Sequence, residues 1–185
     1  MEKLKRSIRE LRVSNYESKK FVPHGSLRKL MTEVAVTGAL ENSNIGGQNL
    51  PETVKAIVPG GCKIFAILVL DDNWKYFTRF IQDDQLQDWD LDHRLPFTLL
   101  QLRKILPQED ADLFEEKQWE FAAPEFSGKV NLRYLDKQTI LPFTNDKKIG
   151  SGGFGEVYHI EIHNEYNRFE PSAQRAVYHP RCFSK

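Results

Sequence analysis

The chain has 185 residues, of which 40% are hydrophobic, 28% charged and 11% aromatic, and this composition excludes a fully disordered protein. Two cysteines are too few for a disulfide framework, and the absence of a CxxC pair argues against a thiolate zinc site. The longest apolar run, Ile64 to Leu70, is far shorter than the ~20 residues that cross a bilayer, and no signal-peptide h-region follows the N-terminus. We therefore expect no membrane partner and a reducing, cytoplasmic or nuclear setting.

The balanced net charge hides an uneven distribution. Residues 1–30 carry nine basic and three acidic side chains, residues 31–127 carry eight and seventeen, and residues 128–185 carry nine and six. The acidic middle would repel phosphates, so we expect no nucleic-acid groove there. We interpret the basic start as a solvated helix face, with RNA, a membrane or an acidic partner as the alternatives.

Helices are predicted over most of the chain before Trp119. Leu4, Ile8 and Leu11 form one apolar stripe, which predicts a helix over residues 2–12. A helix capped by Ser26 would follow and reach Val34. The continuous apolar run 63–70 fits a buried helix or a buried strand, and its helical surroundings favour the helix. Further helices are predicted at 51–58, 74–81, 96–105 and from Pro107 onward.

The pattern changes at Trp119, where apolar residues begin to recur at short intervals as far as Ile140, and this predicts small strands and turns. The expected fold class is therefore α+β. Residues 1–142 would form a mostly helical accessory or interaction module that ends in a short β element, and residues 143–185 would form a second, β-containing part. Cys62, next to an apolar run, is expected to be a buried, inert thiol.

The segment 149–158 carries the one motif with a specific chemistry, in which Gly150, Gly152, Gly155 and Val157 form G-x-G-x-x-G-x-V. Three glycines let backbone N–H groups approach phosphate oxygens closely. A Walker A loop would need Gly-Lys-Ser/Thr at its end, and a dinucleotide fingerprint would need a helix after it. The alternating residues 158–162 instead predict a strand, which places the glycines in a β-hairpin.

This segment resembles the glycine-rich loop of eukaryotic protein kinases, including the aromatic tip and the Glu-Val-Tyr that follows. The resemblance implies that residues 143–185 begin a kinase N-lobe with its first β-hairpin, in which Ile149 ends the first strand. ATP would be the cofactor, together with Mg²⁺ in a complete kinase. Val157 would pack on adenine, and the phosphates would lie under Gly150, Ser151, Gly152, Gly153, Phe154 and Gly155.

Residues 1–142 resemble, more loosely, the N-terminal region of a group of filamentous-fungal protein kinases. The matching pieces are Phe21 to Leu30, Lys63 to Leu70 and Leu95 to Phe97. The resemblance implies ATP binding and Ser/Thr protein phosphorylation for the full-length family, with the chain as an N-terminal fragment that ends within the N-lobe.

Several residues that a kinase needs are missing from the chain. No lysine lies between Glu156 and Ser184, and His179 stands where the third-strand lysine would be expected after Ala176 and Val177. No catalytic loop or metal-binding residue follows, so we assign no catalytic or metal-ligating residue and expect the chain as given to be inactive. His159, Glu161 and His163 share a strand face, but three ligands on one flat strand rarely converge on a metal. The alternative reading is a non-catalytic interaction module, with residues 1–142 binding a protein partner and a relic glycine loop.

Overall fold

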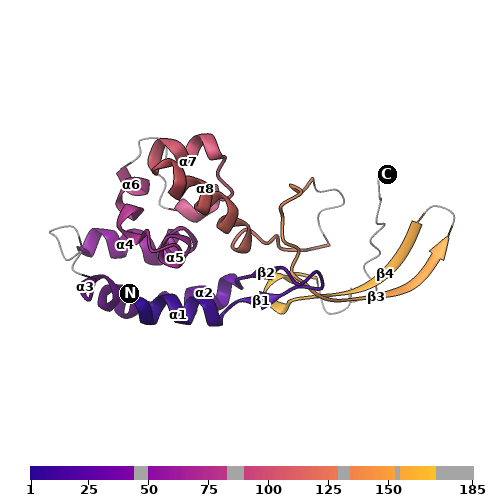
Figure 1. Cartoon of the computed structure of the whole chain (residues 1–185). Coiled ribbons are helices and arrows are strands. Elements are labelled where there is room, and N and C mark those ends of the chain that lie inside the picture. The colour runs from indigo at the N-terminus through magenta and orange to yellow at the C-terminus, as the bar shows by residue number, and fades with distance from the viewer. Residues whose placement is uncertain (44–49, 83–89, 129–133, 153–154, 170–185) are drawn as a thin grey trace. The chain divides into compact units, whose positions relative to one another are not determined.

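The computed structural model describes residues 1–43, 50–82, 90–128, 134–152 and 155–169, and this part of the chain has an α+β fold, as expected (Figure 1). Short 3₁₀ turns occupy residues 74–76, 91–94, 118–120 and 164–166. The helices are α1 (Glu2–Glu10), α2 (His24–Leu30), α3 (Glu33–Glu41), α4 (Leu50–Gly60), α5 (Cys62–Leu70), α6 (Phe77–Gln82), α7 (Leu99–Ile105) and α8 (Gln108–Lys117), and the strands are β1 (Val13–Ser14), β2 (Lys20–Phe21), β3 (Phe143–Gly152) and β4 (Gly155–Ile162).

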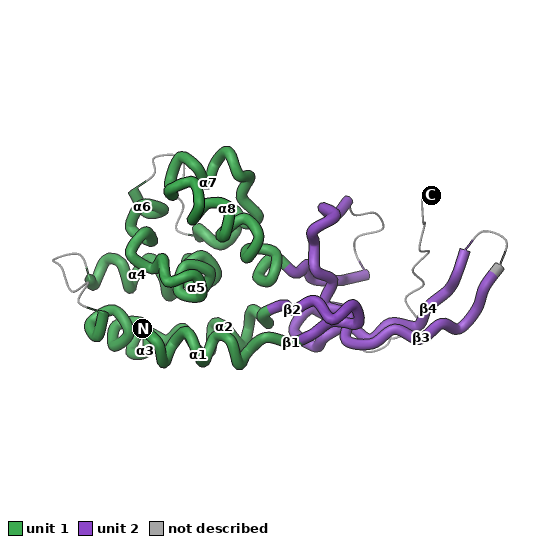
Figure 2. Tube along the Cα trace, viewed as in Figure 1, with its two compact units in different colours: residues 1–13, 22–122 green, residues 14–21, 123–185 purple. Residues whose placement is uncertain are grey.

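The chain divides into two compact units, which Figure 2 shows in different colours. Unit 1 comprises residues 1–13 and 22–122 and holds all of these α-helices. Unit 2 comprises residues 14–21 and 123–185 and holds the β3–β4 hairpin. The expected boundary, after residue 142, lies within unit 2, because the segment before the hairpin pairs with the segment after it.

Helix α5 is the centre of the unit 1 core. Every residue from Ile64 to Leu70 is at least 93% buried, which confirms the helix expected for this run. A helix that is apolar on all sides is stable only when other helices surround it. Residues of α1, α2, α4, α6 and α8 contact α5 and supply that surrounding layer.

The N-terminus of α5 is capped from a distant part of the chain. The Asp92 carboxylate accepts hydrogen bonds from the Lys63 backbone N–H at 2.9 Å and from that of Ile64 at 3.1 Å. Asp92 is only 9% exposed, and burial raises its pKa to about 6, although the two hydrogen bonds act in the opposite direction. The carboxylate satisfies backbone donors in the first turn of the helix, which have no intrahelical partner.

Helix α1 confirms the expected amphipathic pattern. Leu4 and Ile8 are buried in the core, and the helix ends at Glu10, with Leu11 as its C-cap. The Lys5 side chain is also buried, and its ammonium lies 2.5 Å from the Asp72 carboxylate just beyond α5. The remaining basic side chains of α1 leave the core and face outward.

The helix expected from Ser26 to Val34 is wrong in its extent. Helix α2 begins at His24 and ends at Leu30, and α3 begins after Thr32, whose side chain accepts a hydrogen bond from the Ala35 N–H at 3.3 Å. The threonine cap therefore decides where the second of the two helices starts.

The start of one further helix and the end of another differ from the sequence expectation. Helix α7 begins at Leu99 rather than at Pro96, because Thr98 and Gln101 form a capping box there. Helix α4 continues through Pro59 to Gly60. Helix α8, in contrast, begins directly after Pro107, as expected.

The small strands expected after Trp119 are largely absent from the described residues. Trp119 lies in a 3₁₀ turn, and Phe126 forms a single parallel bridge with Asn167. Residues 129–133, where Val130 and Leu132 would have continued the pattern, lie outside the described part of the chain.

Aromatic contacts hold unit 2 together at the base of the hairpin. The Phe21 ring lies 5.6 Å from the ring of Tyr166, and Phe126 lies 5.1 Å from Phe143. The Tyr16 N–H donates to the Phe143 carbonyl at 2.8 Å. Residues 14–21, which precede the hairpin by more than a hundred residues, thus form part of its support.

No single helix in the described part is long and apolar enough to cross a membrane. Helices α4 and α5 reach that length and hydropathy only as a pair, and the pair is bent by 108°.

We expect Gly61→Ala to destabilise unit 1 by about 1–3 kcal/mol, because an added methyl group would overpack the core. A Cβ at this position would lie 2.7 Å from the Phe77 Cζ atom and 3.0 Å from the Ala56 carbonyl oxygen. Urea unfolding followed by tryptophan fluorescence measures the change. Gly38→Ala is the matched control: its Cβ meets no atom within 4 Å, so this variant should be as stable as the original or more so.

Stability is expected to fall as the pH rises from about 4 to about 6. Burial raises the pKa values of Asp92 and Asp71 to about 6 from 3.8, so the folded state binds more protons than the unfolded state in this range. Asp92→Asn should flatten the pH dependence, whereas the exposed Asp112→Asn should preserve it. Urea unfolding at a series of pH values tests this, and an unchanged slope in Asp92→Asn would contradict it.

Candidate functional site

The register of the β3–β4 hairpin determines how the glycine motif is presented. The strands pair antiparallel, with Lys148 opposite Tyr158, Gly150 opposite Val157 and Gly152 opposite Gly155. Ile149 has no partner in this register, so it forms a β-bulge. The motif therefore lies in a β-hairpin, as the sequence predicted, and not at the start of a helix.

The bulge brings the glycines to one face. Without it, Gly150 would pair with Glu156 and lie on the opposite face from Val157. Since side chains alternate along each strand and paired residues share a face, the shifted register places Gly150, Gly152, Gly155 and Val157 together. We call this surface the glycine face. Gly155 is exposed on this face, and Gly150 and Val157 are half-buried.

The opposite face of the hairpin carries a charged cluster. The Lys148 ammonium forms an ion pair with the Glu156 carboxylate, and the Tyr158 hydroxyl donates to the same carboxylate at 2.6 Å. The hydrogen bond to Glu156 raises the pKa of Lys148. Cross-strand pairs of this kind stabilise one register over its neighbours. The negative charge of Glu156 is thus held on the face away from the glycines.

The backbone conformation requires a glycine at one position of the motif but not at another. Gly155 has a φ of +148°, a conformation that side chains rarely adopt. Gly150 has no such requirement, because a Cβ there would meet no atom within 4 Å. The fold therefore explains the glycine at 155 but not the one at 150.

The remaining members of the predicted site lie at the hairpin tip or beside it. Ser151 pairs with Glu156 and is exposed. Gly153 and Phe154 lie outside the described residues. Ile149 does not end the strand as expected, since β3 continues to Gly152, and its side chain is 51% exposed.

Lys147 and His159 are candidate site residues that the sequence analysis missed. They pair directly across the strands, both are exposed, and alternation places them on the glycine face next to Gly150 and Val157. Their position depends on the bulge at Ile149, which the sequence pattern does not reveal. Lys147 adds positive charge to the surface that the glycines leave bare.

The described residues do not form a metal centre from His159, Glu161 and His163. Among them, no group of three or more His, Cys, Asp or Glu side chains could hold a metal ion. His163 follows the end of β4, its Nδ1 accepts from the Glu165 N–H at 3.3 Å, and its ring packs 5.5 Å from that of Phe21. It is a structural residue of the hairpin base.

Cys62 is buried, as expected. Its thiol is 2% exposed and donates to the Ile57 carbonyl at 3.3 Å. Burial, followed by the nearby Asp92 charge, raises the thiol pKa to about 12, so it carries almost no thiolate at neutral pH.

Comparison of the chain with models of protein families, with curated proteins and with solved structures gave no match. The likeness of residues 149–158 to a kinase glycine-rich loop is therefore a resemblance of sequence, and what it implies for the hairpin remains a prediction.

We expect Gly155→Ala to weaken the hairpin by about 1–3 kcal/mol, because the side chain would be forced into a strained backbone conformation. Hydrogen exchange of the cross-strand amides of β3 and β4 measures the loss of protection. Gly150→Ala, with open space around its Cβ, should leave the exchange rates unchanged or slow them. Equal effects of the two substitutions would show that the conformation of Gly155 is not what the hairpin requires.

Proposed function

We propose that the β3–β4 hairpin is a nucleotide-binding flap of the kind found in protein kinases. The phosphates of ATP would lie along Gly150, Gly152 and Gly155, and adenine would pack on Val157. The observation that carries the proposal is the register, because it gathers these glycines and the valine on one face of the hairpin. Ser151, Gly153 and Phe154 complete the proposed loop.

The charges on the hairpin favour an anion on the glycine face. Lys147 lies on that face, whereas Glu156 is paired with Lys148 on the other one. A triphosphate would therefore meet a surface without side chains at the glycines and one exposed ammonium, with the nearest carboxylate of the loop already neutralised. The open space at Gly150 leaves room for this approach.

The proposal for this chain is limited to binding. The sequence has no lysine between Glu156 and Ser184, and phosphoryl transfer by a kinase requires such a lysine and metal ligands. We infer that the chain corresponds to the N-terminal part of a protein-kinase-like polypeptide. Phosphorylation of Ser/Thr, with Mg²⁺, would belong to a longer polypeptide that supplies the remaining groups.

A second candidate function is the binding of a protein partner by the helical residues, without nucleotide. A surface pocket lined by residues of α1 and α3 favours it. The two functions occupy different units of the chain, so each can be abolished without the other.

ATP is expected to stabilise the hairpin. A ligand present at a hundred times its Kd adds about 2.7 kcal/mol to the free energy of unfolding. Titration of the ¹⁵N-labelled chain with ATP should shift the amide signals of β3 and β4 and slow their hydrogen exchange.

Gly150→Leu should abolish both effects, because it places a side chain on the glycine face at a position where an added Cβ meets no atom within 4 Å. Gly38→Leu, at another glycine with open space around it, is the matched control and should respond to ATP as the original chain does. The proposal would be overturned if ATP caused neither amide shifts nor slower exchange in the original chain. It would also be overturned if both effects persisted in Gly150→Leu.

A further inference from the structure

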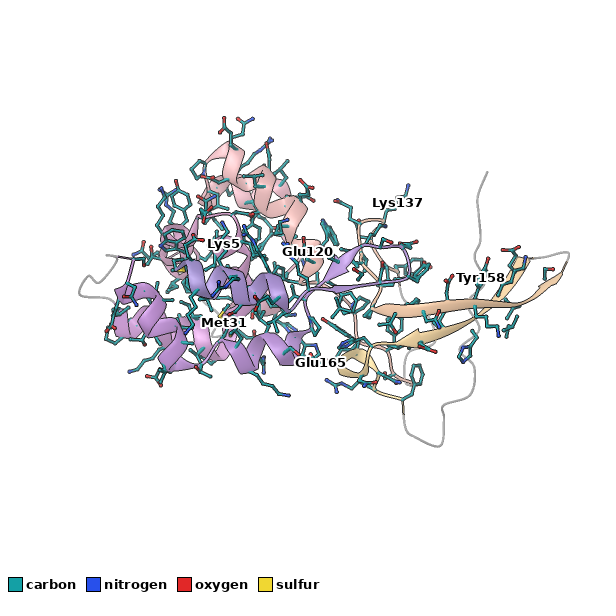
Figure 3. The ribbon with its side chains drawn as sticks, turned by 60° about the horizontal axis from the view of Figure 1, so that its bottom comes forward. Lys5, Met31, Glu120, Lys137, Tyr158 and Glu165 are labelled. Carbon is teal, nitrogen blue, oxygen red and sulfur yellow. The ribbon has the colours of Figure 1, made fainter. Side chains whose placement is uncertain are left out.

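The glycine face continues beyond Gly150 and Val157 to the next pair of residues that it presents, Lys147 and His159. Because a strand rises about 3.4 Å per residue, His159 lies about 7 Å along β4 from Val157. Tyr158, which stands between them in the sequence and is labelled in Figure 3, belongs to the opposite face, where its hydroxyl donates to Glu156. A molecule that packs on Val157 therefore has His159 as its next neighbour on the same strand.

Lys147 and His159 are available to such a molecule. Both are exposed, and neither side chain takes part in a hydrogen bond or an ion pair of the described residues. Cross-strand pairs of opposite charge stabilise a hairpin, as Lys148 and Glu156 do on the other face. The pair formed by Lys147 and His159 supplies no such ion pair.

The two strands present different chemistry on the glycine face. The β3 side carries Gly150 and Gly152, which have no side chain, and the ammonium of Lys147. This combination suits phosphate groups, which need room and positive charge. The β4 side carries the aliphatic side chain of Val157 and the imidazole ring of His159. A flat aromatic base packs well on such a surface.

Packing of this kind does not identify the base. Every base has a ring face for stacking, whereas adenine and guanine differ in the donors and acceptors on their edges. The next pair on the glycine face, Asn145 and Glu161, lies about 7 Å beyond His159. The Asn145 amide donates to the Glu161 carboxylate at 3.4 Å, so these two edge-reading groups are occupied with each other.

We propose that the glycine face binds purine nucleoside triphosphates without selecting the base. Val157 and His159 pack against the ring of adenine or guanine, and Lys147 attracts the phosphate that lies next to Gly150. The inference rests on the nucleotide binding proposed above for the hairpin, and it adds the class of ligand and the two residues that determine it.

Calorimetric titration of the full chain with ATP, GTP and AMP tests the class of ligand. The Kd values for ATP and GTP should agree within about threefold, because both bases offer the same ring face. AMP should bind roughly tenfold more weakly, because it brings less negative charge to Lys147 and a shorter phosphate chain to the glycines.

The imidazole of His159 is tested by two substitutions. His159→Ala should weaken ATP and GTP by the same factor, roughly tenfold, because the stacking surface is lost. His159→Phe keeps an aromatic ring and should restore most of the affinity for both. His93→Ala removes an exposed histidine from unit 1 and should change neither Kd.

Lys147→Ala should weaken ATP and GTP severalfold, because one cation is lost beside the phosphates. Lys137→Ala removes the same charge from an exposed position of unit 2 outside the hairpin and is the matched control.

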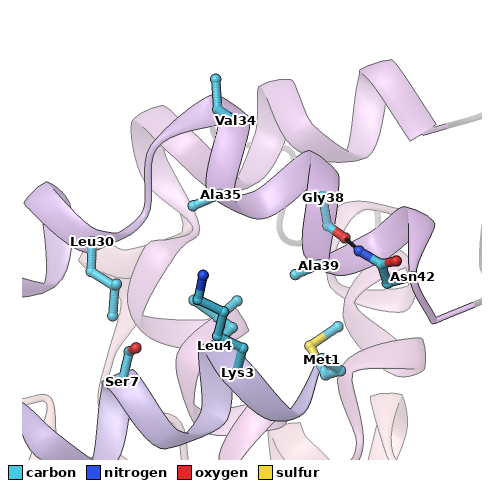
Figure 4. Close-up of a pocket in the computed structure, with 10 residues that line it drawn as sticks. All are labelled: Met1, Lys3, Leu4, Ser7, Leu30, Val34, Ala35, Gly38, Ala39 and Asn42. Atoms are coloured by element: carbon cyan, nitrogen blue, oxygen red, sulfur yellow. Dashed lines mark hydrogen bonds between the residues drawn. The ribbon is translucent and has the colours of Figure 1, made fainter.

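The surface pocket of unit 1, which Figure 4 shows with Lys3 and Gly38 in its wall, is a second place where a nucleotide would find a cation. Gly38→Leu adds a side chain there and should leave the affinities for ATP and GTP unchanged. If Gly38→Leu abolished binding and His159→Ala did not, the nucleotide would belong to the pocket and the inference would be overturned.

Failure of this inference is distinguishable from failure of nucleotide binding at the hairpin. Tight binding of ATP with GTP more than roughly tenfold weaker would show that the base edge is read, which overturns the inference and leaves the nucleotide-binding flap intact. A His159→Phe variant as weak as His159→Ala would overturn the stacking role of the ring. If neither triphosphate bound, both proposals would fail together.

Discussion

The cap that Asp92 provides to α5 is the interaction on which unit 1 depends. Helix α5 is buried on all sides, so its first N–H groups need an acceptor inside the protein, and Asp92 supplies it from nearly thirty residues away. Burial at this position raises the pKa of the Asp92 carboxylate to about 6. Helix α1 packs its apolar stripe and Lys5 against the α5 region, which leaves Lys3 and Arg6 exposed.

In unit 2 the corresponding constraint is the hairpin register. Phe143 fixes the base of β3 through its contacts with Tyr16 and Phe126, and the Lys148–Glu156 pair holds the strands near the tip. The bulge at Ile149, directly after Lys148, moves the following residues of β3 to the other face. The glycine face thus results from tertiary support at one end and from a cross-strand ion pair at the other.

Strong local patterns were enough to predict part of the fold. The apolar run of α5, the stripe of α1 and the alternating residues of β4 were each interpreted correctly. Residues whose role depends on distant partners were not, since Asp92 and the support from residues 14–21 leave no local signal. The motif gave the members of the candidate site, but the bulge, and with it the place of Lys147, depends on pairing energies that a single strand does not show.

The described glycines separate into those that the fold requires and those that it does not. Gly61 is required by the close approach of Phe77, and Gly155 by its φ of +148°. Gly38 and Gly150 meet open space, although glycine weakens the helix and the strand that contain them. Both lie on surfaces where a side chain would obstruct an approaching molecule. A residue that costs stability without serving the fold leaves space at the surface, and the nucleotide proposal for the hairpin depends on that space at Gly150.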